Sequence, residues 1–276
     1  MTAATLSRVA TSGPARDPGF TDLLRSELTK IRTLRSTTWA LLAMVVISLG
    51  LDITTTSVFT AKFTTLDPST QAEFRNNTIG LILQPGAQFG QLAVCALGVL
   101  LMASEYSTGM IRASMLAAPR RTPVLAAKAT VFGVLVFVLA ELVALPSFFI
   151  GSAITGKYAS TSITQPTTLR AILAFGVFMA LMGLIALFVG TIVRHPAAGI
   201  SIVLALQFVV PVLVSLVPGS LGEHLSDAFP ANTDVMMGTG PTDPGALTPI
   251  QGFGCLLAWT VVLFLLARFS LKHRDV

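Results

Sequence analysis

Charged side chains are scarce in this sequence. Asp, Glu, Lys and Arg make up 11% of its 276 residues, whereas apolar residues supply 53%. Soluble globular domains carry about 25% charged residues, because water must solvate their surface. So low a charge content excludes an ordinary water-soluble domain and favours a chain that is largely surrounded by lipid.

Cysteine and histidine are also few. Both cysteines, Cys95 and Cys255, lie in apolar runs, which argues against a disulfide framework. The three histidines are too far apart for two of them to bind a metal from one helix: His195, His224 and His273. We therefore expect no metal site and no directly bound cofactor.

Sequence motifs of catalysis are missing as well. The segment from Gly151 to Lys157 approaches a phosphate-binding loop, but Tyr158 stands where a Ser or Thr hydroxyl would hold magnesium. No Gly-x-Ser-x-Gly nucleophile motif is present. We expect no enzyme activity in this chain, so any ATP hydrolysis must come from a separate subunit.

Long apolar runs are what the sequence has instead. A membrane-spanning helix needs about 20 apolar residues. Runs of this kind cover residues 37–58, 79–103, 126–151, 169–193, 197–217 and 250–269. They predict an all-α membrane protein with six transmembrane helices in one domain, 37–276. The polar segment 1–16 does not have the pattern of a secretory signal and is expected to be a disordered tail.

Basic residues predict the orientation in the membrane. If the N-terminus is cytoplasmic, most of the 18 Lys and Arg residues fall inside, and the exceptions are Lys62, Arg75, Lys157 and Arg170. By the positive-inside rule this asymmetry favours cytoplasmic N- and C-termini in a plasma membrane. The net charge of +5 is explained without a nucleic-acid partner.

A helix on the cytoplasmic surface is expected before the first span, over residues 17–36. Asp17 can cap it and Pro18 suits its first turn, while apolar residues recur at helical spacing from Phe20 to Leu34. The pattern indicates an amphipathic helix in the membrane interface. The alternative is a basic juxtamembrane helix that only fixes the topology.

The loop between the second and third spans has helical spacing of its own. Its apolar residues, from Tyr106 to Met115, define one side of a short helix, and Glu105 and Arg112 lie on the other. Pro119 ends this helix before the third span begins. Such a helix could press on a partner, or it could be a turn that positive charge anchors.

Polar groups inside the spans are candidates for a translocation pathway. Gln84, Gln88, Gln91 and Cys95 form one stripe on the second span, which should face other helices or a wet cavity. Hydrogen bonding that merely holds the bundle together explains the stripe equally well.

Two acidic residues also lie within apolar runs. Glu141 is about 20 Å along the third span from Lys128, at a depth where an ionisable group suggests function. It could bind a cationic substrate, relay a proton, or be protonated and packed. Asp52, near the outer end of the first span, is expected at the membrane interface.

The order of these parts resembles the permease subunit of an ABC-2 type ATP-binding-cassette exporter, of the type V class. The resemblance covers nearly the whole chain: the amphipathic helix, six spans, the Glu105–Arg112 loop and the long outer loop of about 218–248. It implies that the loop is a coupling helix that contacts an ATPase through Glu105, Tyr106, Gly109, Ile111 and Arg112. It also implies short re-entrant helices in the outer loop, and an ordinary structured loop is the alternative.

The resemblance further implies partners and a task. Such permeases pair with a second permease subunit, usually an identical copy, and with two ATPase subunits that bind ATP and magnesium. They export drugs, antibiotics, lipids or polysaccharides, so a hydrophobic or amphipathic substrate is expected. Two other functions stay open: a secondary transporter that Glu141 couples to protons, and a membrane anchor that transports nothing.

Overall fold

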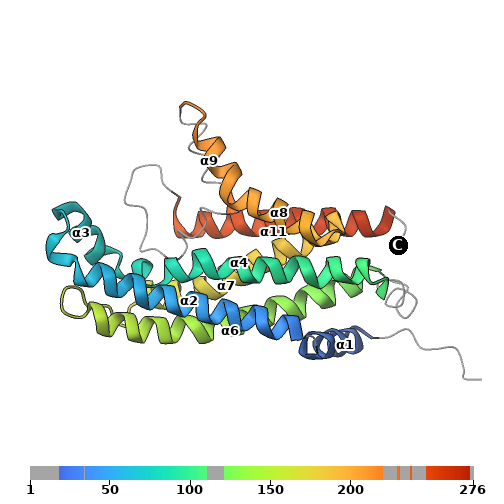
Figure 1. Ribbon diagram of the computed structural model, residues 1–276, viewed down its shortest axis with the longest axis horizontal. Coiled ribbons are helices and arrows are strands. Elements are labelled where there is room, and N and C mark those ends of the chain that lie inside the picture. The colour runs from blue at the N-terminus through green and yellow to red at the C-terminus, as the bar shows by residue number, and fades with distance from the viewer. Residues whose placement is uncertain are drawn as a thin grey trace, which may run out of the picture.

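Six helices in this computed structural model are long and apolar enough to cross a membrane (Figure 1). The structure describes residues 19–33, 35–110, 121–219, 229–230, 237 and 247–273. The spans are α2 (Arg35–Ala61), α4 (Thr78–Ser107), α6 (Arg121–Thr155), α7 (Pro166–Val193), the run Pro196–Ser215 and α11 (Pro249–His273). The described residues form no strand. The predicted all-α membrane protein with six spans is confirmed.

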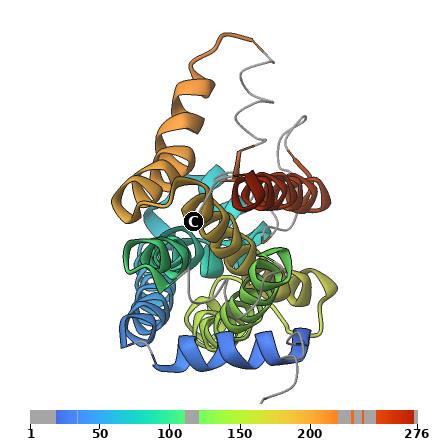
Figure 2. The same cartoon turned by 90° about the vertical axis from the view of Figure 1, so that its right-hand side faces the viewer.

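The remaining helices lie at the two ends of this bundle. Helix α1 (Phe20–Thr33) crosses one end, which also holds the C-terminal end of α11 (Figures 1 and 2). The short helices η1 (Phe63–Thr65) and α3 (Pro68–Asn76) lie at the other. These are called the α1 end and the α3 end below. That the α1 end is cytoplasmic stays a prediction.

Helix α1 has the amphipathic character that its sequence predicts. Asp22 stabilises its first turn by accepting a hydrogen bond from the Gly19 amide at 3.1 Å. The helix buries Ile31 and, unexpectedly, Glu27, whereas Phe20 is 47% exposed. The predicted cap, Asp17, lies outside the described residues.

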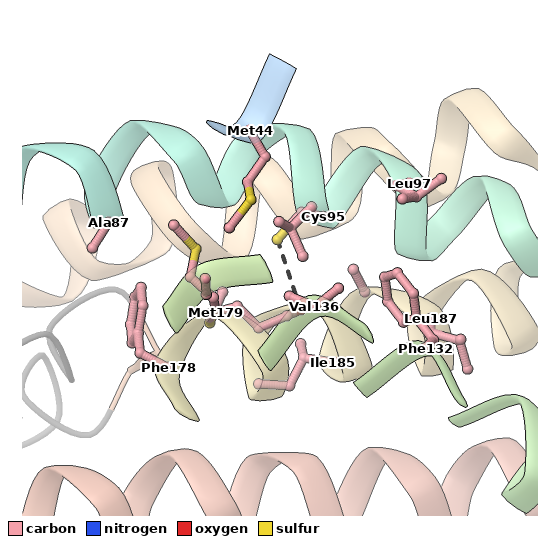
Figure 3. Packing of buried hydrophobic residues seen from close by; sticks show 14 of the residues in the cluster. Met44, Ala87, Cys95, Leu97, Phe132, Val136, Phe178, Met179, Ile185 and Leu187 are labelled. Carbon is pink, nitrogen blue, oxygen red and sulfur yellow. Dashed lines mark hydrogen bonds between the residues drawn. The ribbon is translucent and has the colours of Figure 1, made fainter. Parts of the chain in front are cut away.

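Helices α4 and α7 are the middle of the bundle and bury more of their length than the other spans. Their close approach depends on glycine: a Cβ at Gly98 would lie 2.5 Å from the Gly183 carbonyl oxygen, and one at Gly190 would lie 2.8 Å from that of Val99. Small residues at helix contacts let backbones approach in membranes. Around this contact the apolar core includes Met44 and Phe132 (Figure 3).

The fifth span is broken. It consists of α8 (Pro196–Leu204), a π-helical turn η2 (Ala205–Val209) and α9 (Val210–Ser215). Pro211 lies just after the π turn, so two causes of a helix break coincide there. Figures 1 and 2 show α9 leaning away from the other spans.

The Gly98 contact makes a testable prediction. Gly98→Ala should lower the stability of the protein by about 1–3 kcal/mol, because the added methyl group overpacks the α4–α7 contact. The matched control is Gly254→Ala on α11, where nothing lies within 4 Å of the added carbon. The control variant should be as stable as the wild type or slightly more stable, because Ala has a higher helix propensity than Gly. Thermal unfolding in detergent, followed by tryptophan fluorescence, measures both; equal shifts in the two variants would refute the close approach.

Candidate functional site

Four charged side chains from three helices meet at the α1 end. Lys128 of α6 places its Nζ 2.6 Å from Glu27 Oε2 of α1 and 2.8 Å from Glu105 Oε1 of α4. Lys30 of α1 places its Nζ 2.7 Å from Glu27 Oε1 and 3.3 Å from Glu105 Oε1. We call these four residues the charge cluster. It joins α1 to the ends of two membrane spans.

The charge cluster is almost removed from solvent. The side chains of Glu27, Glu105 and Lys128 are 3%, 5% and 4% exposed, and only Lys30, at 32%, reaches the surface. Burying a single ion costs several kcal/mol, so a buried charge must be paired. Two carboxylates and two ammonium groups make the charge cluster neutral as a whole.

The electrostatics within the charge cluster favour the ionised forms. Burial alone would raise the pKa of Glu27, but the ammonium groups of Lys128 and Lys30 outweigh it and hold that pKa below its ordinary value. Burial alone would likewise lower the pKa of Lys30, but Glu27 and Glu105 raise it above its ordinary value. Both groups are therefore charged at neutral pH.

Tyr106 makes a second connection beside the charge cluster. The guanidinium of Arg194 lies over its ring, 4.8 Å from the centroid, and Arg194 Nη2 donates to the Ser270 carbonyl at 3.3 Å. Arg194 ends α7 in a left-handed conformation, with φ of 61°. The consecutive residues Glu105 and Tyr106 thus connect α4 to α1, α6, α7 and α11.

The expected coupling residues fall partly within the described chain. Glu105 is buried in the charge cluster, and Tyr106 is half-buried under Arg194. Gly109 is exposed just after α4, where its φ of 72° favours glycine. Ile111 and Arg112 lie outside the described residues, as does most of the coupling helix expected there. Tyr106, at the expected start of that helix, belongs to α4.

One residue of the glutamine stripe contacts the broken fifth span. Gln91 is fully buried, and its Oε1 accepts a hydrogen bond from Gln207 Nε2 of the π turn at 2.7 Å. The Oε1 atom of Gln88 is buried without a hydrogen-bond partner among the described residues. Gln84 lies nearer the α3 end, beside Phe74 in a small pocket. Cys95, in the same stripe, donates from its Sγ to the Met182 carbonyl of α7 at 3.7 Å, so the stripe makes bonds to more than one neighbouring helix.

Asp52 is more deeply enclosed than its predicted position near the outer end of the first span suggests. It is 1% exposed among three helices. Its Oδ1 accepts from the Gly86 amide at 2.7 Å and its Oδ2 from Ser147 Oγ at 2.6 Å, while Ser48 Oγ donates to the Gly86 carbonyl at 2.9 Å. Pro85 interrupts the hydrogen bonding of α4 here, so that Ser48 and Asp52 of α2 bind its backbone at Gly86.

Glu141 does not join the glutamines. It lies on α6 against Gly176 of α7. Its surroundings differ from those of Asp52, the other acidic residue within an apolar run. The Oε1 atom of Glu141 is buried against the backbone of Gly176. The structure thus divides the predicted pathway residues between two places.

Sequence reasoning missed Glu27, Lys30 and Lys128 as a site. A signal was present: Glu27 lies one helical turn from Ile31, in the middle of the apolar face of α1. Lys128 likewise stands alone within an apolar run. An isolated charge on an apolar face requires a buried partner, although the sequence does not say which one.

Comparisons with known proteins add no family. No protein-family model matches the chain, and no curated protein matches it. Within the described residues, no group of three or more His, Cys, Asp or Glu side chains could hold a metal ion. Function must therefore be inferred from the contacts above.

Removing one charge from the charge cluster should be costly. Glu105→Gln leaves buried Lys128 with one carboxylate and should destabilise the protein by about 3 kcal/mol. Adding Lys128→Met should recover much of the loss, because Glu27 and Lys30 still form a neutral pair. Glu73→Gln, at an exposed position of α3, is the control and should change little. Denaturation in detergent measures all three; a double variant no more stable than Glu105→Gln would contradict the buried pairing.

The lowered pKa of Glu27 predicts how stability depends on pH. A depressed carboxyl pKa adds stability above the ordinary value of 4.5, and this is lost as pH falls through the folded-state pKa. The difference in melting temperature between wild type and Glu27→Gln should therefore be constant near neutral pH and shrink below pH 4.5. Paired melting curves from pH 7 to pH 3 test this, and a difference that grows in acid would contradict it.

Proposed function

We propose that this chain is the membrane-spanning subunit of an ATP-driven exporter of the ABC-2 type. In this proposal a separate ATPase acts on the segment after Glu105 and Tyr106, at the α1 end of the bundle. The chain works with a second permease subunit and two ATPase subunits that bind ATP and magnesium. Its substrate is a hydrophobic or amphipathic molecule that leaves the cell.

The observation that carries the proposal is the position of the charge cluster. Glu105 is the first residue of the expected ATPase contact, which continues to Arg112, and it is bonded to Lys30 of α1 and Lys128 of α6. A displacement of the segment after α4 would therefore move α1 and α6 with it. A membrane anchor that transports nothing does not need such a linkage.

Helix breaks deeper in the bundle support a change of shape. Pro85 in α4, Pro146 in α6 and the π turn Ala205–Val209 interrupt three of the six spans. Breaks of this kind can serve as hinges between rigid segments. Movement imposed at the α1 end could thus open or close the opposite half of the bundle.

The first experiment asks whether an ATPase partner recognises the loop after α4. The tagged chain, purified from native membranes, should retain a P-loop ATPase whose ATP hydrolysis the substrate stimulates. Arg112→Ala should lower retention of the ATPase about tenfold, since charged contacts at interfaces contribute 1–2 kcal/mol or more. Arg268→Ala, on the exposed surface of α11, is the matched control.

A second variant separates coupling from assembly. Glu105→Gln with Lys128→Met keeps a neutral pair in the charge cluster but removes the bonds of α6 to both α4 and α1. It should retain the ATPase and hydrolyse ATP, yet transport several-fold less substrate per ATP. Transport by the chain alone, driven by a proton gradient and abolished by Glu141→Gln, would overturn the proposal in favour of a secondary transporter.

A further inference from the structure

A small pocket lies at the α3 end, where Figure 1 shows α3 beside the adjoining ends of α2 and α4. Its volume is about 210 Å³. Thr70, Glu73 and Phe74 of α3 line one side of it. These residues are three and four positions apart, so they share one face of a helix. We call this cavity the α3-end pocket.

Helix α4 supplies a second wall. Asn77, Leu81 and Gln84 line the α3-end pocket at spacings of four and three residues, which places them on one helix face. Asn77 joins α3 to α4, and its carboxamide lies against Gly80, where an added Cβ would be 2.5 Å from Asn77 Oδ1. The absence of a side chain at Gly80 thus leaves room for a polar group beside the pocket.

The α3-end pocket carries one charge. Glu73 is the only charged side chain among the described residues that line it, and the aromatic residues Phe59 of α2 and Phe74 line it as well. No Lys or Arg of the described chain forms an ion pair with Glu73. Arg75, two positions away, does not line the pocket, because its guanidinium lies over the Phe63 ring, 5.2 Å from the centroid. The carboxylate therefore has no counter-charge within the described structure.

The glutamine stripe of α4 starts at this pocket. Gln84 lines the α3-end pocket, and Gln88 and Gln91 follow on the same helix face, one and two turns further along. The Oε1 atom of Gln88 is buried without a hydrogen-bond partner among the described residues. The pocket is thus continuous in sequence register with the residues predicted to form a translocation pathway.

We propose that the α3-end pocket binds the ammonium group of an amine, with Glu73 as its counter-charge. A hydrogen bond between an ammonium group and a carboxylate is stronger than one between neutral groups. Aromatic faces such as those of Phe59 and Phe74 also attract cations. The carboxamide oxygens of Asn77 and Gln84 are further acceptors for its N–H groups.

The size of the pocket limits what it holds. Pockets for drug-sized ligands begin at about 300 Å³, and the α3-end pocket is smaller. It therefore holds the ammonium group and the carbons next to it, while the rest of the ligand lies outside. The ammonium group belongs either to a free amine or to the ethanolamine headgroup of a phospholipid, which present the same chemistry.

The inference names a substrate class for the exporter and in that respect rests on the proposed function. The α3 end is opposite the expected ATPase contact, so it is the end at which substrate is expected to leave. Binding of the amine itself requires neither ATP nor a second subunit. The pocket can therefore be tested on the chain alone.

Binding to the purified chain in a nonionic detergent tests the site. The probe is a photoreactive alkyl amine, and its control is the alcohol of the same shape. The amine should label peptides from residues 59–84 at about three- to thirtyfold lower concentration than the alcohol, the range for one cation–π contact with a partly exposed ion pair. Glu73→Gln should remove this preference and leave labelling by the alcohol unchanged, which also shows that the variant is folded. Asp22→Asn, at an exposed acid of α1, is the matched control and should retain the preference.

Added lipid identifies the source of the ammonium group. Phosphatidylethanolamine is mixed into the micelles, with phosphatidylglycerol as the control that has no amine. Competition with the probe by phosphatidylethanolamine alone assigns the α3-end pocket to a lipid headgroup. Labelling that neither lipid reduces assigns it to a free amine.

Two results would overturn the inference. One is equal labelling by amine and alcohol in the wild-type chain, and the other is an amine preference that survives Glu73→Gln. The exporter proposal fails separately. Amine binding that depends on Glu73 in a chain that retains no ATPase would keep the site and reject the exporter, whereas ATP-driven transport without any amine preference would keep the exporter and reject the site.

Discussion

The ammonium group of Lys128, held between two carboxylates, is the interaction on which the α1 end of this protein depends. A lysine this deeply buried cannot remain charged without partners, and Glu27 and Glu105 supply them from two other helices. The second lysine, Lys30, then balances the remaining negative charge at the edge of the site. One desolvated cation thereby fixes the placement of α1 against the spans. Apolar packing alone would let an amphipathic helix slide along the surface.

The same requirement, that polar groups be paired away from water, explains the interior of the bundle. Next to Pro85, the backbone of α4 at Gly86 forms hydrogen bonds with the side chains of Asp52 and Ser48 of α2. At the π turn of the fifth span, Gln207 reaches Gln91 of α4. Each break is thus connected to a neighbouring helix, so a bend in one span must displace another. This arrangement suits a bundle that moves in concert better than one with independent hinges.

The spans could be predicted from the sequence because lipid imposes a simple rule on length and composition. The run 79–103 became α4, Thr78–Ser107, and the run 169–193 became α7, Pro166–Val193. Capping and turn residues added the last few residues, as Pro166 does at the start of α7. The ends of these two spans were therefore predicted to within a few residues.

The contacts themselves could not be predicted. Glu27 and Lys128 are 101 positions apart, and Asp52 and Ser147 are 95 apart. A single sequence contains no record of which side chains meet at such separations. Asp52 was assigned to the interface because position along a helix was the only guide. An acid within an apolar face, such as Glu27, does reveal that a partner exists.

The kink at Pro85 also has a consequence for how the protein is made. Asp52 and Gly86 are synthesised before Ser147, so the carboxylate of Asp52 lacks its second donor until α6 has entered the membrane. Lys128 is on the same helix, so it too is synthesised after its partners Glu27 and Glu105. Insertion of α6 thus completes two polar sites at opposite ends at once. Without α6, each of the two sites lacks one of its polar partners, so both are complete only when this helix is in place.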